Sequence, residues 1–576
     1  MSDVEGRYKI VFNGEIYNYR ELKSSLKDWE FQTSSDTEVI LAAYKEWGAS
    51  CFGRFIGQFA VCIFDRKENR ITIARDMMGE KPLYIHTNSD GIFCSSEIRG
   101  LLPFLMERPT INASAFNDYL HYQYVPEPGS IIDNILKVTP GEIVSIDVTS
   151  LEMTKDTFWN WCVPKVDKRR VTISDIEQQL RSAVNYSLVA DVPVALGLSA
   201  GLDSAAIAVF AKEAGTELST YTIGYPNKPA YDERDAAGML ARHLGLKNTQ
   251  VEIDPDNFTD NFENYCNALS EPIADTAGYG HYLVPKTIAE YGHKVMLSGI
   301  GGDELFWGYE WTRFAVQYQQ QIKFNAPSVV VDMLRSTPRL LKLIFMMSRS
   351  RRVPAKLKPY FRLLYTMLVR TTPKDQTMFM GISGAPEFTT QIDVGGGFFP
   401  DTGRMRDLKS VYRHTENITD VSSTADIIVE LLSKLNRTWL ISNCVQLADT
   451  VSMANSIESR SPFLNPNLIK TMLSSNIQHQ ADARSSKAVL RKILANKLPK
   501  KLLNRPKSGF VTPVAKWVDL LEQKYAGAVE DGVLVEQGLI KKGFFNLRDV
   551  RNVTLHTKYR LILLEKWYSN LVNKYL

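Results

Sequence analysis

One short stretch, LGLSAGLDS at residues 196–204, constrains the fold of this chain more than any other. An apolar, β-branched segment precedes it, and the alanine-rich residues 205–211 that follow favour a helix. A strand, a turn of small residues and a helix point backbone N–H groups at an anion. No lysine follows Gly201, so this is not the phosphate loop of kinases and GTPases. The turn suits an ATP whose pyrophosphate leaves, and the alternative is a corner of small residues with no ligand.

The composition sets several classes of protein aside. At 576 residues the chain is too long for one core, so two to four domains are expected. A net charge of +4 gives no reason to expect nucleic acid or an anionic membrane as a partner. The six cysteines form no C-x-x-C pair, which argues against zinc or a disulfide framework and favours a reducing cytoplasm. No run of about 18 apolar residues could span a bilayer.

Short strands separated by turns dominate about the first 145 residues. An amphipathic helix is expected at 38–47, after the cap-like pair Ser35 and Asp36. The charged residues 167–170 link this part to the next. The expected strands are 8–13, 58–65, 71–74 and 92–95.

From about residue 190, strands alternate with helices, which favours a parallel sheet with helices on both faces. Ligands of such sheets bind at the carboxyl ends of the strands. A second glycine-rich turn, SGIGGDE at 298–304, follows another apolar strand. Because each turn carries an aspartate, Asp203 or Asp303, we expect one shared nucleotide and metal site. The expected strands are 192–198, 219–225, 249–253 and 294–297, and the expected helices are 204–214, 232–244 and 256–269.

After residue 309 the pattern becomes helical. Residues 326–370 combine apolar helices with many basic side chains. A buried helical layer with a solvated basic face is the favoured interpretation, and a docking face for an anionic acceptor or a membrane surface is the alternative. Residues 381–403 have the composition of a long loop.

Recognisable motifs are spread over nearly the whole chain. They are FNGEIYNYREL (12–22), SDTEVILAAY (35–44), ARDMMGEKPLY (74–84), SSEI (95–98), DVPVALGLSAGLDS (191–204), YDE (231–233), EPIAD (271–275), LSGIGGDELFWGY (297–309), SMANSIESRSPFLN (452–465), KAVLRKIL (487–494) and RPKSGF (505–510). In this order they resemble the asparagine synthetase family of the glutamine-hydrolysing type. The resemblance implies an α/β chain: an incomplete N-terminal-nucleophile glutaminase sandwich, residues 1–165, then a parallel-sheet ATP-pyrophosphatase (adenine nucleotide hydrolase-like) domain with added helices, residues 170–576.

The resemblance implies a cytoplasmic, ATP-dependent ligase. In this family a carboxylate attacks the α-phosphate of ATP and forms an acyl-adenylate, and ammonia from glutamine travels internally and displaces AMP. ATP and Mg²⁺ are the implied cofactors, and aspartate is the default acceptor. The implied partners are small-molecule substrates, with no nucleic acid and no membrane span, and a homodimer is left open.

The implied catalytic residues are Asp203, Asp303 and Lys487. Both aspartates would hold Mg²⁺, which neutralises charge developing on the pyrophosphate. Lys487 would stabilise negative charge in the adenylation step or on the tetrahedral intermediate, unless it is a surface lysine at the start of a helix. The implied ATP and pyrophosphate site comprises Leu198, Ser199, Gly201, Asp203, Ser204, Ile223, Gly224, Ser298 and Gly299.

In the first half, Asn13 and Gly14 resemble the family's oxyanion donors. Glu15 and Asp36 resemble the pair that grips the α-ammonium of glutamine. The family nucleophile is a cysteine at the mature N-terminus, and here no cysteine precedes Cys51. We therefore expect an N-terminally truncated chain with a partly exposed glutaminase sheet, which makes its amide from free ammonium.

Two further positions depart from the family pattern. Ala200 stands where a glycine is usual, which is tolerable if its φ is negative. Ile300 stands where asparagine synthetases usually carry Glu or Asp, and an apolar side chain neither accepts a proton nor binds an ammonium. The acceptor could therefore be a sugar uronic acid, a peptide carboxylate in ring closure, or another carboxylate of surface polysaccharide or secondary metabolism. A non-catalytic binding protein is a third alternative, against which the two retained metal acids argue.

Overall fold

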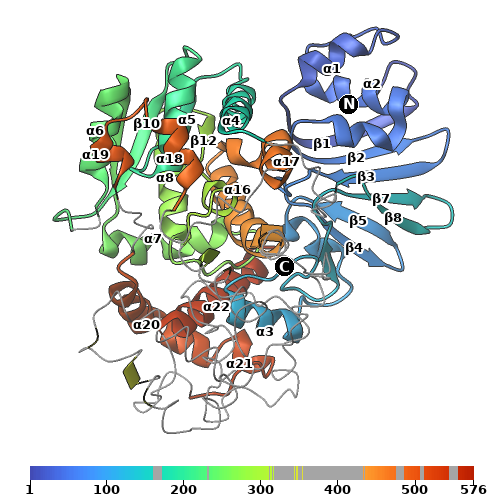
Figure 1. Ribbon diagram of the computed structural model, residues 1–576. Coiled ribbons are helices and arrows are strands. Elements are labelled where there is room, and N and C mark those ends of the chain that lie inside the picture. The colour runs from blue at the N-terminus through green and yellow to red at the C-terminus, as the bar shows by residue number, and fades with distance from the viewer. Residues whose placement is uncertain are drawn as a thin grey trace, which may run out of the picture.

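The computed structural model describes residues 1–159, 171–229, 232–309, 436–474, 486–505, 512–543 and 555–575, with a few single positions between 312 and 435. Two sheet-containing halves lie side by side, and helices from the end of the chain pack below them (Figure 1). The expected basic segment 326–370 and the expected loop 381–403 lie almost wholly outside the described residues.

The first half forms two antiparallel sheets. The larger has the order β1 (Tyr8–Ile16), β2 (Gly57–Asp65), β3 (Arg70–Arg75), β7 (Glu142–Asp147) and β8 (Met153–Thr157), and the smaller has β5 (Gly91–Ser95), β4 (Tyr84–Asn88) and β6 (Ile135–Lys137). Strands β1, β2, β3 and β5 were expected from the sequence, and the other four were not. Within the described residues β1 is the edge of its sheet, where the Val11 side chain is 75% exposed.

Helix α2 (Asp36–Trp47) begins at the predicted cap. The hydroxyl oxygen of Ser35 accepts a hydrogen bond from the N–H of Thr37 at 3.1 Å, which satisfies one of the unpaired donors of the first turn. The Oδ2 atom of Asp36 accepts a second hydrogen bond from the N–H of Ile16 at 2.9 Å. This bond ties the start of the helix to the end of β1.

The second half contains the parallel sheet that the alternating pattern predicted. Its order is β11 (Lys247–Glu252), β10 (Ser219–Gly224), β9 (Val194–Gly197), β12 (Val295–Leu297) and β13 (Glu458–Arg460), and all four pairings are parallel. The sequence predicted the first four strands and missed β13, which lies far along the chain from β12. The expected helices are present as α5 (Leu202–Glu213), α6 (Arg234–Leu244) and α7 (Pro255–Ala268).

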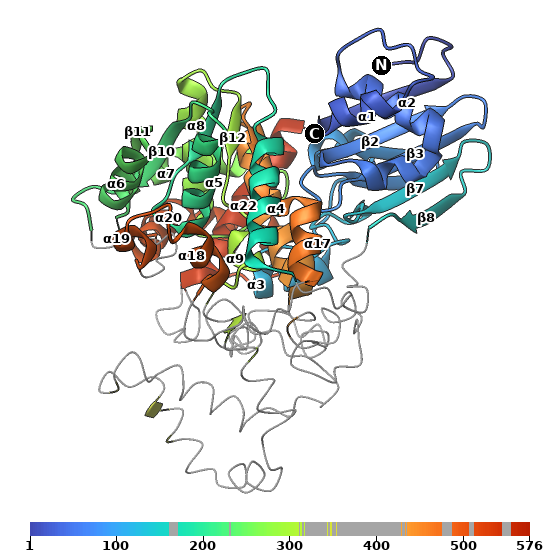
Figure 2. The same cartoon turned by 45° about the horizontal axis from the view of Figure 1, so that its top comes forward.

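The side chains of β9 alternate between two apolar layers, as the period of a strand requires. Val194 and Leu196 belong to the core that contains α5. Ala195 packs on the opposite face, with Ile288 of α8 (Gly278–Glu290). Helices therefore cover both faces of the sheet (Figure 2), as the sequence predicted.

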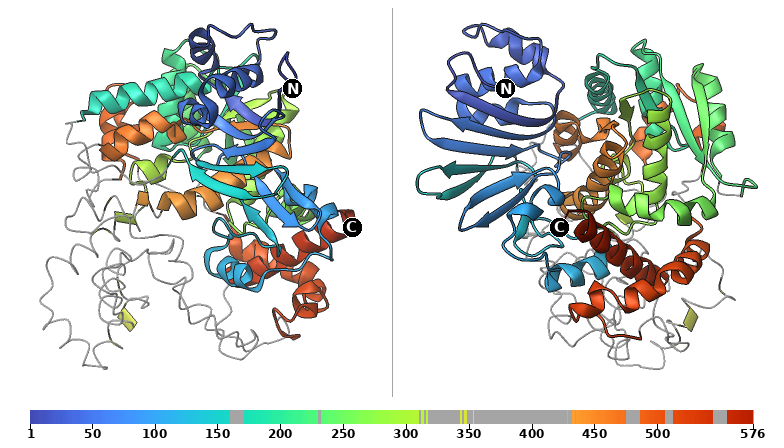
Figure 3. Two further views of the ribbon diagram at one scale, coloured as in Figure 1. Left: turned by 90° about the vertical axis from the view of Figure 1, so that its right-hand side faces the viewer. Right: turned by 180° about the vertical axis from the view of Figure 1, so that it is seen from behind.

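The end of the chain joins the two halves. Helix α22 (Leu555–Tyr575) packs against α20 (Val514–Glu530), α7 and α3 (Ala113–Tyr122), the last of which comes from the first half (Figure 3). The hydroxyl of Tyr119 in α3 donates to the backbone carbonyl of Arg560 at 2.8 Å. Among the helices in the described ranges, none is long and apolar enough to cross a membrane.

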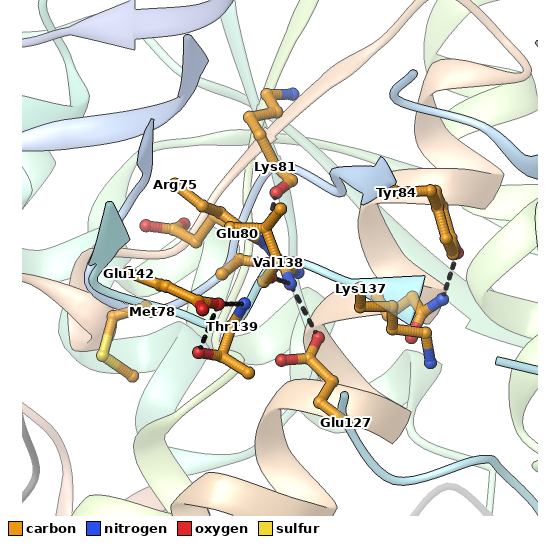
Figure 4. A network of polar contacts seen from close by, with 12 residues as sticks. Arg75, Met78, Glu80, Lys81, Tyr84, Glu127, Lys137, Val138, Thr139 and Glu142 are labelled. Carbon is orange, nitrogen blue, oxygen red and sulfur yellow. Dashed lines mark hydrogen bonds and ion pairs between the residues drawn. The ribbon is translucent and has the colours of Figure 1, made fainter. Parts of the chain in front are cut away.

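A buried polar network lies where the halves meet (Figure 4). Arg75 is only 1% exposed. Its guanidinium pairs with Glu127 at 2.8 Å and donates to three backbone carbonyls. The nearby Lys81 ammonium reaches Asp449 of the second half at 2.7 Å. Because breaking a buried ion pair leaves an uncompensated charge, the Lys81–Asp449 contact opposes separation of the two halves.

Candidate active site

Two glycine-rich turns meet at the centre of the parallel sheet. Strands β9 and β12 are neighbours, and the chain continues from β9 toward β10 and β11 on one side and from β12 toward β13 on the other. The carboxyl ends of β9 and β12 thus form the topological switch point, where open parallel sheets bind ligands. The turn at 198–201 leads into α5, and the turn at 298–301 leads into α9 (Gly302–Leu305).

Three charged side chains converge at this switch point. The ammonium of Lys487 lies 2.7 Å from Oδ1 of Asp303 and forms a second ion pair with Oδ2 of Asp203. Burial disfavours the charged ammonium, but the two carboxylates together outweigh it and raise the pKa of Lys487 above its ordinary value. One cation is therefore held between two acids that lie in the first turns of two different helices, α5 and α9.

Lys487 is not a surface lysine, because only 4% of the residue is exposed. It does directly precede a helix, α18 (Ala488–Leu494). Its backbone has φ 54° and ψ 39°, the left-handed region that residues other than glycine seldom adopt. Such strain persists where the surroundings hold a residue firmly, often at functional sites.

Glycines allow the acids to approach the turn backbone. A Cβ atom on Gly302 would lie 2.5 Å from Cγ of Asp203. A Cβ atom on Gly308 would lie 1.7 Å from Oδ1 of Asp303 and 2.6 Å from Cε of Lys487. The sequence analysis did not single out Gly308. A glycine five positions after Asp303 was the one local sign of this close approach, and the other side chain involved, Lys487, is distant in sequence.

Hydroxyl groups build the first turn. The side-chain oxygens of Ser199 and Ser204 lie 2.9 Å apart, and the N–H of Gly201 donates to the Ser199 hydroxyl at 3.1 Å. Leu198 continues the backbone pairing beyond the end of β9, since its N–H donates to the carbonyl of Tyr221 at 2.8 Å. Ala200 is not among the residues with positive φ, so its methyl group is tolerated.

The end of β10 lies against an arginine that sequence reasoning missed. A Cβ atom on Gly224, the residue after Ile223, would lie 1.9 Å from Nε of Arg234. That guanidinium pairs with Asp232 at 2.8 Å and Glu252 at 2.9 Å. Gly224 therefore leaves space for a guanidinium at the carboxyl end of β10.

The second turn is anchored to the edge of the sheet. The N–H of Ser298 donates to the carbonyl of Arg460 in β13 at 2.9 Å. A Cβ atom on Gly299 would lie 3.1 Å from Cβ of Asp203, so the two turns are in close contact. Ile300 is partly buried and packs against the apolar core of the second half.

The expected glutamine-binding residues gather around the end of β1. Asn13 donates its side-chain N–H to the Ser96 hydroxyl at 3.0 Å. Gly14 has φ 148°, and a Cβ atom there would lie 2.0 Å from the carbonyl oxygen of Gln58, so only glycine fits. The backbone conformation at Gly14 thus depends on the neighbouring strand β2.

Glu15 and Asp36 form a pair of perturbed acids. Burial and the neighbouring Asp36 raise the pKa of Glu15 to about 7, against the opposing effect of Arg460. Burial also raises the pKa of Asp36, although hydrogen bonds to its carboxylate oppose the shift. Two like charges in a partly buried site favour protonation or the binding of a cation.

An antiparallel sandwich joined to a parallel-sheet domain with acids and a lysine at its switch point has the architecture of an ATP-dependent amidotransferase. The asparagine synthase family profile matches residues 175–554, and the glutamine amidotransferase domain profile matches residues 1–159. The chain belongs to the asparagine synthase family, which confirms the resemblance seen in the motifs. It is an enzyme of the glutamine-hydrolysing asparagine synthetase type, a ligase that uses ATP.

Relatives align over most of the chain. Asparagine synthetase [glutamine-hydrolyzing] 1 of Bacillus subtilis is 28% identical over 517 residues, covering 89% of this chain and 77% of that protein. A putative asparagine synthetase [glutamine-hydrolyzing] of Mycobacterium tuberculosis is 30% identical over 548 residues, covering 92% of this chain and 79% of that protein. Amidase chry2 of Gibberella zeae is 24% identical over 553 residues, covering 89% of this chain and 78% of that protein.

Proposed function

We propose that this enzyme amidates aspartate to asparagine through an aspartyl-adenylate, with an amidotransferase domain at residues 1–165 and an ATP-pyrophosphatase domain at 170–576. The observation that carries the proposal is the convergence of Asp203, Asp303 and Lys487 at the switch point. The relatives named asparagine synthetases support aspartate as the acceptor.

The proposed reaction has two bond exchanges. An oxygen of the acceptor carboxylate bonds to the α-phosphorus of ATP, and the bond from that phosphorus to the bridging oxygen breaks, so that pyrophosphate leaves. The nitrogen of ammonia then bonds to the acyl carbon, the acyl–oxygen bond breaks, and AMP and a proton leave. Lys487 is placed to stabilise the negative charge that develops in either step.

The two carboxylates suit Mg²⁺. Asp203 and Asp303 already face one cation, the Lys487 ammonium, and Mg²⁺ is commonly bound by one or two carboxylates together with substrate phosphates. Across the described ranges no group of three or more acidic, histidine or cysteine side chains offers a fuller cage. Mg²⁺ bound there would neutralise charge on the pyrophosphate.

A second candidate is amidation of another carboxylate, such as a sugar uronic acid. Ile300 favours it, because the turn lacks an acid at this position, and the similarity to a protein named as an amidase is compatible with it. The test is pyrophosphate release with Mg-ATP and ammonium across a panel of carboxylic acids. Aspartate should give the highest kcat/KM; a uronic acid in that place would favour the second candidate.

Ile300→Glu is expected to lower pyrophosphate release with aspartate at least about tenfold, because a carboxylate would be forced against an apolar core. Ile300→Leu, which keeps the volume, serves as the control and should retain activity within about threefold. Steady-state kinetics on both variants checks this. A rise in aspartate turnover in Ile300→Glu would contradict it and would favour a native acceptor other than aspartate.

Glutamine binding should strengthen as the pH rises. Glu15 has a pKa of about 7, so its carboxylate is lost as the pH falls through that value, while the α-ammonium of glutamine stays charged. We expect the dissociation constant for glutamine, measured by calorimetry, to fall roughly tenfold between pH 6 and pH 8. Glu15→Gln should bind weakly with a flat profile. A flat profile in the native chain would exclude Glu15 from the ammonium site.

A further inference from the structure

One residue touches both proposed sites. Arg460 ends β13, the strand that the sequence did not predict, and it is only 2% exposed. Its side chain reaches the glutamine-binding residues of the first half, while its backbone lies beside the second nucleotide turn.

The side chain is held from several directions. Nη2 lies 3.7 Å from Oε2 of Glu15, Nε donates to Oε1 of Glu458 at 2.6 Å, and the guanidinium lies 5.0 Å from the centre of the Tyr17 ring. Nη1 donates to the backbone carbonyls of Val189 at 2.5 Å and Ser187 at 3.2 Å. Because the guanidinium is planar and rigid, these partners fix both its place and its orientation.

The backbone of the same residue supports the nucleotide turn. Arg460 pairs with Leu297 in the parallel ladder, and its carbonyl accepts the hydrogen bond from Ser298. Ser298 opens the turn that carries Asp303. A shift of Arg460 would therefore move the start of that turn.

A further contact fastens β13 to the first half. The side-chain amide of Gln58 donates to Oε1 of Glu458 at 3.0 Å, the oxygen that also accepts from Arg460. Gln58 is the register partner of Glu15 in the β1–β2 ladder. Glu15, Gln58, Glu458 and Arg460 thus form one connected group across the boundary between the halves.

We propose that Arg460 is a positioning residue that couples glutamine binding to nucleotide binding, and this rests on the proposed function of the two sites. The α-ammonium of glutamine competes with the Arg460 guanidinium for the Glu15 carboxylate. When glutamine occupies Glu15 and Asp36, the guanidinium of Arg460 loses Glu15 and keeps its bonds to Glu458 and to the two backbone carbonyls. The resulting shift of Arg460 reaches Ser298 through the hydrogen bond to its backbone carbonyl. Because coupling between two binding equilibria is reciprocal, ATP changes the affinity for glutamine by the same factor.

The test measures both equilibria on the full chain by calorimetry, with Mg-ATP and glutamine as the probes. In the native chain, saturating glutamine should change the dissociation constant of ATP at least about fivefold, and ATP should change that of glutamine equally. Arg460→Lys keeps the charge but loses the planar guanidinium, and Tyr17→Leu removes the ring that faces it. In both variants the dissociation constant of each ligand should be nearly the same with and without the other ligand. Tyr17→Phe keeps the ring and is the matched control.

Each outcome decides between the alternatives. The coupling is overturned if glutamine does not bind, or if glutamine leaves the dissociation constant of ATP unchanged in the native chain. It is also overturned if both Arg460→Lys and Tyr17→Leu show the same change in that constant as the native chain. Should Arg460→Lys fail to fold, Tyr17→Leu still provides the comparison. Pyrophosphate release with ammonium and the carboxylic acid panel is measured in parallel, so a wrong acceptor is told apart from a wrong coupling.

Discussion

Replacing Lys487 by methionine is expected to lower ammonium-dependent pyrophosphate release by about 10²–10³-fold, the usual cost of removing a group that stabilises developing charge. The side-chain ammonium of Lys487 contacts both Asp203 and Asp303 in a buried site, where electrostatic interactions are stronger than in water. Methionine is unbranched and one atom shorter than lysine, so it fills most of the same space while it removes the charge and the N–H donors. The measurement is steady-state release of pyrophosphate from Mg-ATP with aspartate and ammonium.

Two controls separate chemistry from folding. Lys492→Met changes an exposed lysine on the same helix, α18, and should leave the rate unchanged. Thermal unfolding of Lys487→Met should still show a cooperative transition, although the two acids then repel each other. If Lys487→Met keeps more than about a tenth of the native rate, the lysine is structural and the proposed role is wrong.

Asp203→Asn and Asp303→Asn should each reduce pyrophosphate release at least about 100-fold and weaken Mg-ATP binding together. Asparagine has nearly the same shape, so the close approaches of Gly302 and Gly308 are preserved while a full negative charge is lost. Titration calorimetry with Mg-ATP and the release assay measure the two effects.

The exposed acid Asp235 provides the matched control, since Asp235→Asn on α6 removes the same charge from a side chain that is 83% exposed. It should behave as the native chain. Because Asp203, Asp303 and Lys487 act as one unit, the loss of rate in the double variant Asp203→Asn with Lys487→Met should be far smaller than the product of the two single losses. Native pyrophosphate release in both aspartate variants would rule out a shared site.

The amino-acid sequence by itself determined the local elements of this protein. Strands such as β9 and β10, and the glycine turns that follow β9 and β12, depend on apolar alternation and on residues with unusual backbone freedom, and both are properties of short segments. The motifs also sufficed to identify the family and the order of its two parts. Helix α2 began at its predicted cap for the same reason, because capping involves only neighbouring residues.

Only the tertiary structure decided which of these segments meet. Strand β13 has three residues, too few for a period to be visible, and it exists because β12 offers an unpaired edge in the folded sheet. Lys487 lies between Asp203 and Asp303 because α18 is packed beside the switch point, which no local pattern encodes. The positions of Arg234 and Arg460 likewise follow from long-range packing: a buried guanidinium is placed by partners that are distant in sequence and close only in the fold.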